Sequence, residues 1–228
     1  MKALNRLPAW MPSAGKYLTV FLCTGFFNSA FASQNLLSIQ REWAQIEYGQ
    51  LDDDGKIKAL EKLENEATGL VEASSDSEKA GFLIWRGIIR STEAGIDGGI
   101  GALSLVKDAR SDLQTSLKID NTALQGSALT SLGALYYQVP GWPLAFGDDN
   151  KARTYLEQAV KVNPNGIDSN YFYGDFLASQ GENHKAIDVL KTALKAPARP
   201  DRPLADRGRR QEIQKLIEKL IEKLEPSL

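Results

Sequence analysis

A short helical pattern occurs three times in this 228-residue chain, and it restricts the possible folds more than any other feature. In each copy an alanine is followed four residues later by a leucine, on what would be the same face of a helix. The copies lie at residues 107–120, 151–164 and 185–194, and their alanines, Ala109, Ala152 and Ala186, are 43 and 34 residues apart. A helical pattern that recurs at such intervals indicates a stack of similar helical units.

An apolar segment precedes each copy, and each segment contains a glycine beside large side chains. These glycines are Gly87, Gly133 and Gly174. Because glycine has no side chain, it allows a second helix to approach closely, and the small alanine of the following copy does the same from the other side. We expect the leucines to fill the space between neighbouring units, since no single unit can bury its apolar face alone. They are Leu113, Leu156 and Leu190.

The run formed by Tyr173-Gly174, Gly181, Ala186, Leu190 and Ala193 resembles the signature of the tetratricopeptide-repeat (TPR) family. The resemblance implies an all-α, TPR-like α-solenoid of helix-turn-helix repeats whose first helices line a concave groove. It covers residues 80–198, in units at 80–121, 122–165 and 167–198. The layout is also similar to that of exported TPR proteins such as the T component associated with TRAP-type transporters.

Two further helical regions flank these units. Residues 36–73 form a weaker helix pair built on Trp43 and several leucines. Residues 204–224 form one amphipathic helix, which we expect to cap the last apolar face of the solenoid, although a dimerisation or partner helix is the alternative. We therefore predict about four repeats and a C-terminal capping helix within residues 33–228.

The N-terminus has the three-part pattern of a secretory signal peptide, which we assign to residues 1–32. Three basic residues and no acidic ones precede an apolar run, and the run ends in Ala30-Phe31-Ala32, with small residues where a signal peptidase reads. We expect cleavage near Ala32, a periplasmic or secreted protein, and no membrane insertion afterwards. The remaining chain is mildly acidic, which disfavours nucleic acid as a partner.

The sequence lacks the motifs expected of an enzyme. It has one histidine, His184, and its one cysteine, Cys23, lies in the predicted signal peptide. A lone histidine without cysteine builds neither a zinc site nor a nucleophile–base pair. The glycine-rich run at 95–101 lacks the Lys-Ser/Thr of a phosphate-binding loop, so we expect a long flexible connection between two helices. We expect a binding protein with no cofactor.

One segment resembles a calcium-binding EF-hand loop. Asp52, Asp54 and Glu61 fall at ligand positions of that motif, but Gln50 and Lys58 occupy two other positions with the wrong chemistry. The alternative is an acidic helix start, in which the aspartates cap the helix and complement its dipole. We expect no metal, with these three residues as the weak candidates.

In the groove of a TPR array, we expect the lining to come from the first helix of each repeat. The candidates are aromatic, hydroxyl, aliphatic and acidic side chains, which favour an apolar peptide or small organic ligand over an anionic one. They are Ile84, Ile88, Ser91, Ser127, Thr130, Ala134, Tyr137, Gln138, Asp168, Tyr171 and Asp175.

The loop at 139–149 is longer than its counterpart in the last repeat, and it carries two prolines and two aromatic residues, Trp142 and Phe146. An exposed aromatic on a stiff loop is a good binding anchor. The alternative is that both side chains fold back onto the core.

Two functions remain open. An exported protein-interaction scaffold, with a protein or peptide partner, requires a broad open groove and uses the long loops for docking. A small-ligand-binding component associated with a transporter requires a closed pocket, which we expect the loops at 95–101 and 139–148 to cover.

Overall fold

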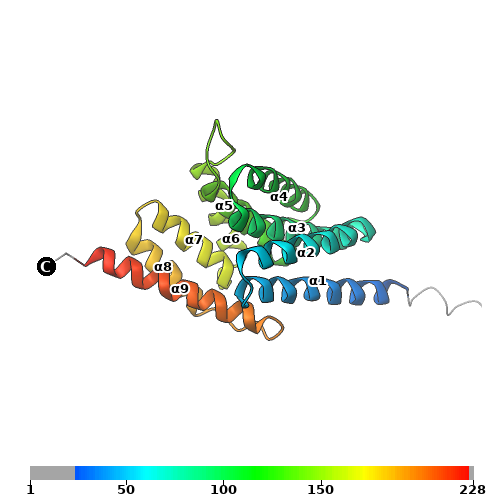
Figure 1. Ribbon diagram of the computed structural model, residues 1–228. Helices are drawn as coiled ribbons and strands as arrows, with labels where there is room; N and C mark the ends of the chain where they lie inside the picture. The colour runs from blue at the N-terminus through cyan, green and yellow to red at the C-terminus, as the bar shows by residue number, and fades with distance from the viewer. Residues whose placement is uncertain (1–23, 226–228) are drawn as a thin grey trace, which may run out of the picture.

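The computed structural model describes residues 24–225, which form helices joined by short connections (Figure 1). The first four helices are α1 (Thr24–Tyr48), α2 (Asp53–Ala73), α3 (Asp76–Asp97) and α4 (Gly99–Ile119). The remaining helices are α5 (Ala123–Gln138), α6 (Asp149–Val162), α7 (Ile167–Ser179), α8 (Asn183–Leu194) and α9 (Pro203–Leu224). The predicted all-α, helical-repeat fold is confirmed: successive helices pair as hairpins, and α9 follows the last pair.

Most of the predicted signal peptide lies outside the described residues. Its last part, residues 24–32, forms the beginning of α1, so the structure leaves export a prediction. Within residues 24–225, no helix combines the length and the apolar character needed to cross a membrane.

The glycine and leucine positions of the repeat meet inside each hairpin. A Cβ atom added to Gly87 would lie 2.9 Å from Cγ of Leu113, and the corresponding distances are 2.5 Å for Gly133 and Leu156 and 2.6 Å for Gly174 and Leu190. All three leucines are fully buried. The contact therefore joins the two helices of one hairpin, rather than lying only between neighbouring hairpins as the sequence had indicated, and it sets how closely they pack.

Local capping explains where several helices begin. The Asp52 carboxylate accepts a hydrogen bond from the backbone N–H of Gly55 at 2.9 Å, so Asp52 is the N-cap of α2. Asp54 lies in the first turn of α2 and Glu61 lies further along the same helix. Asp52 and Asp54 therefore belong to an acidic helix start, to which Glu61 does not belong. No set of three or more His, Cys, Asp or Glu side chains within residues 24–225 is placed to hold a metal ion.

The glycine-rich run at 95–101 is not the long loop that we expected. Its first residues complete α3, its last residues begin α4, and only Gly98 lies between the two helices. Gly98 and Gly99 have φ values of +64° and +66°, a region that glycine reaches without strain. These two positive-φ residues turn the chain sharply, so residues 95–101 lengthen the two helices rather than the connection between them.

An ion-pair network ties α2, α3 and α4 together away from the concave side. Asp112 accepts hydrogen bonds from Arg86 at 2.6 Å and from Arg90 at 2.8 Å, and Arg90 also pairs with Glu64 at 2.7 Å. The Asp112 side chain is only 8 % exposed. Its charge is compensated by two guanidinium groups, as burial of a carboxylate requires.

The last helix, α9, caps α7 and α8 as predicted, and it also reaches back to α1 (Figure 1). Arg210 donates hydrogen bonds to the backbone carbonyls of Leu194 and Ala196 at the end of α8. On its other side, α9 presents Gly208 to the ring of Tyr48 in α1, so closely that a Cβ atom on Gly208 would lie 2.3 Å from Cδ1 of that ring. The first and last helices therefore meet, and the stack of hairpins closes on itself.

Candidate binding pocket

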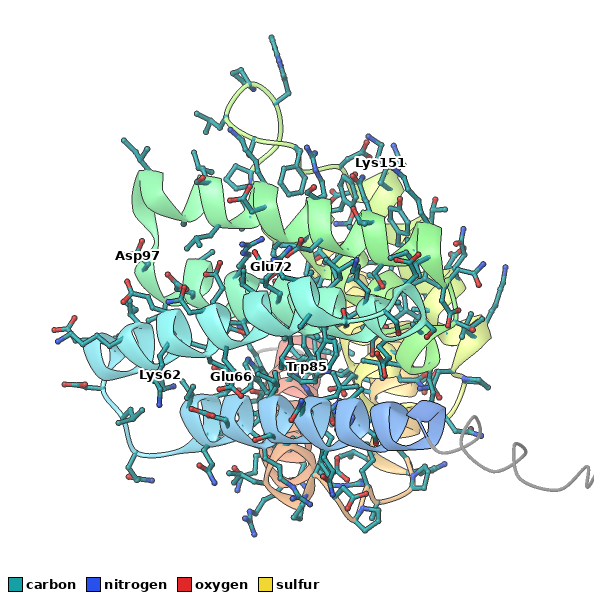
Figure 2. The ribbon with its side chains drawn as sticks, turned by 90° about the vertical axis from the view of Figure 1, so that its right-hand side faces the viewer. Lys62, Glu66, Glu72, Trp85, Asp97 and Lys151 are labelled. Carbon is teal, nitrogen blue, oxygen red and sulfur yellow. The ribbon has the colours of Figure 1, made fainter. Side chains whose placement is uncertain are left out.

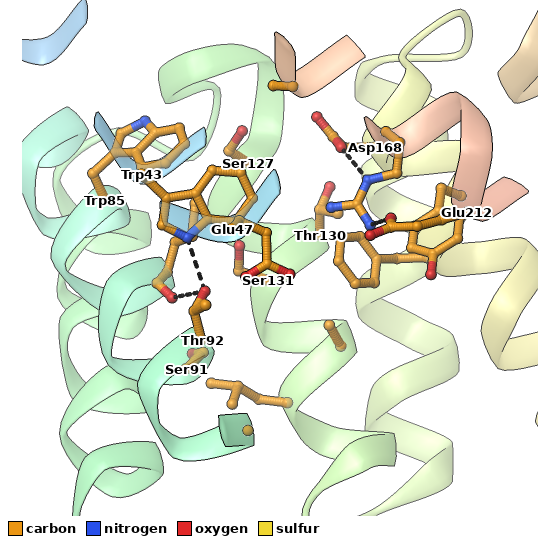
Figure 3. Close-up of a pocket in the computed structure, with 18 of the residues that line it drawn as sticks. Trp43, Glu47, Trp85, Ser91, Thr92, Ser127, Thr130, Ser131, Asp168 and Glu212 are labelled. Carbon is orange, nitrogen blue, oxygen red and sulfur yellow. Dashed lines mark hydrogen bonds and ion pairs between the residues drawn. The ribbon is translucent and has the colours of Figure 1, made fainter. Parts of the chain in front are cut away.

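A pocket of about 420 Å³, partly open to solvent, lies between the helices of this arrangement (Figure 3). Its walls come from α1, α3, α5 and α7, the first helix of every hairpin, and from α9. The second helices of the hairpins contribute no wall, as expected for a solenoid whose first helices face inward. The closure of α9 against α1 is what converts a groove into a pocket.

Two tryptophans form one wall of the pocket. Trp43 of α1 and Trp85 of α3 meet edge to face, with ring centroids 5.6 Å apart. The indole N–H of Trp43 donates a hydrogen bond to the hydroxyl of Thr92 at 2.9 Å, and Thr92 donates in turn to the backbone carbonyl of Ile88 at 3.0 Å. These bonds fix the orientation of Trp43. Figure 2 shows Trp85 inside the molecule, close to α1.

A second group of pocket residues is charged and aromatic. Arg209 of α9 lies over the rings of Tyr171 and Phe172, with its guanidinium carbon 4.3 Å and 4.9 Å from their centroids. It also donates hydrogen bonds to Asp168 at 3.0 Å and to Glu212 at 2.5 Å. Arg209 thus joins α9 to α7 across one side of the pocket, where Figure 3 labels its partners Asp168 and Glu212.

Asp168 is charged despite its depth in the molecule. Burial by itself would raise the pKa of its carboxyl, but Arg209 and Arg199 outweigh that effect and hold the pKa well below its usual range. Arg199 donates to Asp168 at 2.7 Å. A third of the Asp168 side chain, 33 %, is still accessible because it faces the cavity.

Hydroxyl groups of α5 face the space between these two groups (Figure 3). The Ser127 hydroxyl donates to the backbone carbonyl of Leu124 at 3.0 Å. No hydrogen bond from the hydroxyls of Thr130 or Ser131 to any described residue is found. Those two hydroxyls can therefore donate to and accept from a bound molecule.

The structure brings together most of the predicted groove residues, but not all. Ile88, Asp168 and Tyr171 line the pocket, together with Ser91, Ser127, Thr130, Ala134 and Gln138. The others lie elsewhere: Ile84 is fully buried in the core, and the hydroxyl of Tyr137 donates to Asp175 at 2.6 Å between α5 and α7, outside the pocket. Counting along first helices did not distinguish the side chains that face the cavity from those that face the neighbouring helix.

Sequence reasoning missed the contribution of the two ends of the chain. Trp43, Glu47 and Tyr48 of α1, and Arg202 and Arg209 of α9, all line the pocket. The expectation that the lining disfavours an anionic ligand therefore omitted two arginines. The signal that could have revealed them is the concentration of arginine, with Gly208, in the first half of a helix that otherwise reads as a solvated cap.

The loop between α5 and α6 projects from the body of the molecule (Figures 1 and 2), and none of its residues lines the pocket, so the expectation that it would cover the groove is wrong. Its two aromatic side chains are placed differently, one against the protein and one in solvent. Phe146 folds back: it meets Tyr136 edge to face with centroids 5.5 Å apart, and Arg110 lies 4.0 Å from its ring centroid. Trp142 is 89 % exposed, and Leu144 beside it is 69 % exposed. Phe146 thus follows the second alternative, and Trp142 is exposed, as a binding anchor would need to be.

Comparison with known proteins identifies no family for this chain. No family model matches it, and no curated protein is significantly similar. A crystal structure of MamA is 23 % identical over 75 % of this chain and 88 % of that one, with a TM-score of 0.38. Another MamA crystal structure is 21 % identical over 86 % and 98 %, with a TM-score of 0.37. A similarity this distant carries no argument, and the assignment to the all-α helical-repeat class rests on the hairpins themselves.

Proposed function

We propose that this chain is a non-catalytic binding protein that holds a small organic molecule in the pocket between α1, α3, α5, α7 and α9. The observation that carries the proposal is the contact between Tyr48 and Gly208, which brings α9 to α1 beside a partly open pocket of about 420 Å³. Pockets for small molecules generally measure about 300–1,000 Å³, and they combine apolar walls with a few convergent polar groups. The tryptophan wall and the hydroxyls of α5 supply both.

The state of the pocket's charged groups supports binding rather than catalysis. Asp168 and Arg209 hold each other in their charged forms, so neither has a pKa suited to exchanging a proton near neutral pH. His184, the one histidine of the chain, lies in α8 and does not line the pocket. No nucleophile paired with a general base is found among the described lining residues.

A ligand screen by thermal unfolding tests this function. A ligand present at 100 times its dissociation constant should stabilise the protein by about 2.7 kcal/mol and raise Tm. Ser131→Phe, which places a ring in the cavity, should abolish the shift, while Gln158→Phe, an exposed position on α6, should leave it unchanged. A ligand that stabilises the Ser131→Phe variant as strongly as the parent would place its binding outside the pocket.

A second candidate function is docking to a protein partner through the loop tip formed by Trp142 and Leu144. An apolar side chain that is 89 % exposed, on a loop held in place by Phe146, can insert into a pocket of another protein at little entropic loss. Trp142→Ser combined with Leu144→Ser should retain full stability but lose a partner recovered by crosslinking. Retention of every crosslinked partner by the double variant would eliminate the loop tip as a docking site.

The predicted signal peptide would place this binding outside the cytoplasm. Expression of the full chain in a host with a general secretory pathway should yield a product that begins at Ser33, as measured by intact mass. A product that retains residues 1–32 would contradict export by cleavage.

A further inference from the structure

Arg202, at the start of α9, lines the pocket and has no partner for its charge. It makes no ion pair and no side-chain hydrogen bond with any residue between 24 and 225, and its Nε is buried without an acceptor. Burial and the nearby charge of Arg199 lower the pKa of Arg202, and Asp168 and Asp206 oppose that decrease, although neither carboxylate forms an ion pair with the Arg202 guanidinium. Arg202 is half-buried, and a guanidinium withdrawn from water without a bound carboxylate is costly unless something else compensates it.

The nearest carboxylates are already engaged by the other two arginines. Asp206 accepts hydrogen bonds from the backbone N–H and from Nε of Arg199, at 2.7 Å and 2.6 Å. Asp168 accepts from Arg199 and from Arg209. Both acids therefore form their ion pairs with other cations, and within residues 24–225 Arg202 is the cation of this cluster without an ion pair.

Of the acidic residues that line the pocket, Asp168 lies near Arg202 and is neutralised by Arg199 and Arg209, whereas Glu47 and Glu212 lie further along the pocket. Glu212 is ten residues beyond Arg202, which corresponds to about 15 Å along a helix, and its carboxylate is bound by Arg209. Burial raises the pKa of Glu212, Arg209 opposes the rise, and Glu47 adds to it, so Glu47 lies near Glu212. An anion bound at Arg202 would thus be separated from the Glu212 carboxylate. The positive end of the α9 dipole, where Ala205 also lines the pocket, lies on the same side as Arg202.

Aromatic surface adjoins this unpaired cation. The guanidinium carbon of Arg202 lies 5.0 Å from the ring centroid of Trp85, and Trp85 packs against Trp43. Both tryptophans line the cavity. A molecule that places an anion at Arg202 can therefore lay a flat apolar body against the tryptophan wall, where burial of apolar surface adds to its affinity.

Resting on the small-molecule function proposed above, we propose that the ligand is an organic carboxylate, whose carboxylate pairs with Arg202 and whose apolar body packs on Trp43 and Trp85. A carboxylate matches the planar fork of a guanidinium, and it supplies the acceptor that Arg202 lacks. The hydroxyls of Thr130 and Ser131 are available for further polar groups of the ligand.

Isothermal titration calorimetry with matched acids and amides tests this proposal. The probes are 3-phenylpropionate, indole-3-propionate and octanoate, each compared with its uncharged amide. We expect at least one acid to bind about 10- to 100-fold more tightly than its amide, the range of a charge-assisted hydrogen bond. Arg202→Gln should remove that difference while leaving amide binding intact, which shows that the pocket is still folded. Arg207→Gln, an exposed position on the same helix, is the matched control and should change neither.

Each other outcome overturns a defined part of the proposal. Equal binding of acids and amides, or a preference that survives Arg202→Gln, would refute carboxylate recognition while leaving a small-molecule pocket intact. Absence of binding by every probe, in a protein that the thermal screen shows to bind an uncharged compound, refutes it as well. If only peptides with a free C-terminal carboxylate bind, the proposal that the ligand is a small organic acid is refuted, and the small-molecule function is refuted with it.

Discussion

The closure of α9 onto α1 can be tested by one methyl group. Gly208→Ala would place a Cβ atom 2.3, 2.4 and 2.5 Å from three carbons of the Tyr48 ring. Carbon atoms pack at about 3.5–4.0 Å, so the ring or α9 has to move by more than about 1 Å. The ring cannot move freely, because it also packs edge to face on Trp43 with centroids 5.9 Å apart.

The expected magnitude follows from two opposing effects. Overpacking of this kind destabilises proteins by about 1–3 kcal/mol. Replacing a glycine inside a helix by alanine stabilises the helix by about 0.5–1 kcal/mol. We therefore expect Gly208→Ala to lower the free energy of unfolding by about 1–2 kcal/mol, and to weaken ligand binding because Tyr48 lines the pocket.

Urea unfolding with two comparison proteins isolates this contact. Gly69→Ala in α2 is the control: no atom lies within 4 Å of the added Cβ, so only the gain of about 0.5–1 kcal/mol should appear. In a Tyr48→Ala background the clash is absent, and Gly208→Ala should then stabilise the protein as Gly69→Ala does. The reasoning fails if Gly208→Ala stabilises the parent protein as much as Gly69→Ala does, since α9 would then not press on α1.

Two further predictions concern buried charge in the first hairpins. Glu93 is buried, and its burial, together with the nearby charges of Glu64 and Glu61, raises its pKa to about 7. The folded state therefore retains a proton that the unfolded chain releases at lower pH. The free energy of unfolding should therefore fall as pH rises from about 4.5 to 7. Glu93→Gln should raise the free energy of unfolding by about 2 kcal/mol at pH 8, after allowing for solvent screening, and should leave it almost unchanged at pH 4. Urea titrations at both pH values measure this, and an equal effect at pH 4 and pH 8 would contradict it. Asp112→Asn leaves Arg86 and Arg90 without their shared carboxylate. It should therefore lower the free energy of unfolding by about 3–5 kcal/mol in the same assay. A decrease of less than about 1 kcal/mol would show that water already screens the network.

The helix hairpins could be predicted because their determinants are close in the sequence. Gly174 meets Leu190 within a single repeat, and the spacing of such pairs is visible without any structure. Helix starts are similarly local, as the Asp52 cap shows. The conformation of the 139–149 loop was not predictable in this way, because the half-buried Phe146 packs on Tyr136 of α5 and Arg110 of α4, whereas Trp142 is 89 % exposed.

The sequence by itself determined the all-helical class, the repeat and the inward-facing role of the first helices. Only the tertiary structure decided that the array closes, and hence that it contains a pocket rather than an open groove. The closing pair, Tyr48 and Gly208, is 160 residues apart, and its approach depends on the rotation accumulated over every intervening hairpin. Small differences in the crossing angle of each helix pair add up over the stack. No local sequence pattern could therefore place Arg202 beside Trp85.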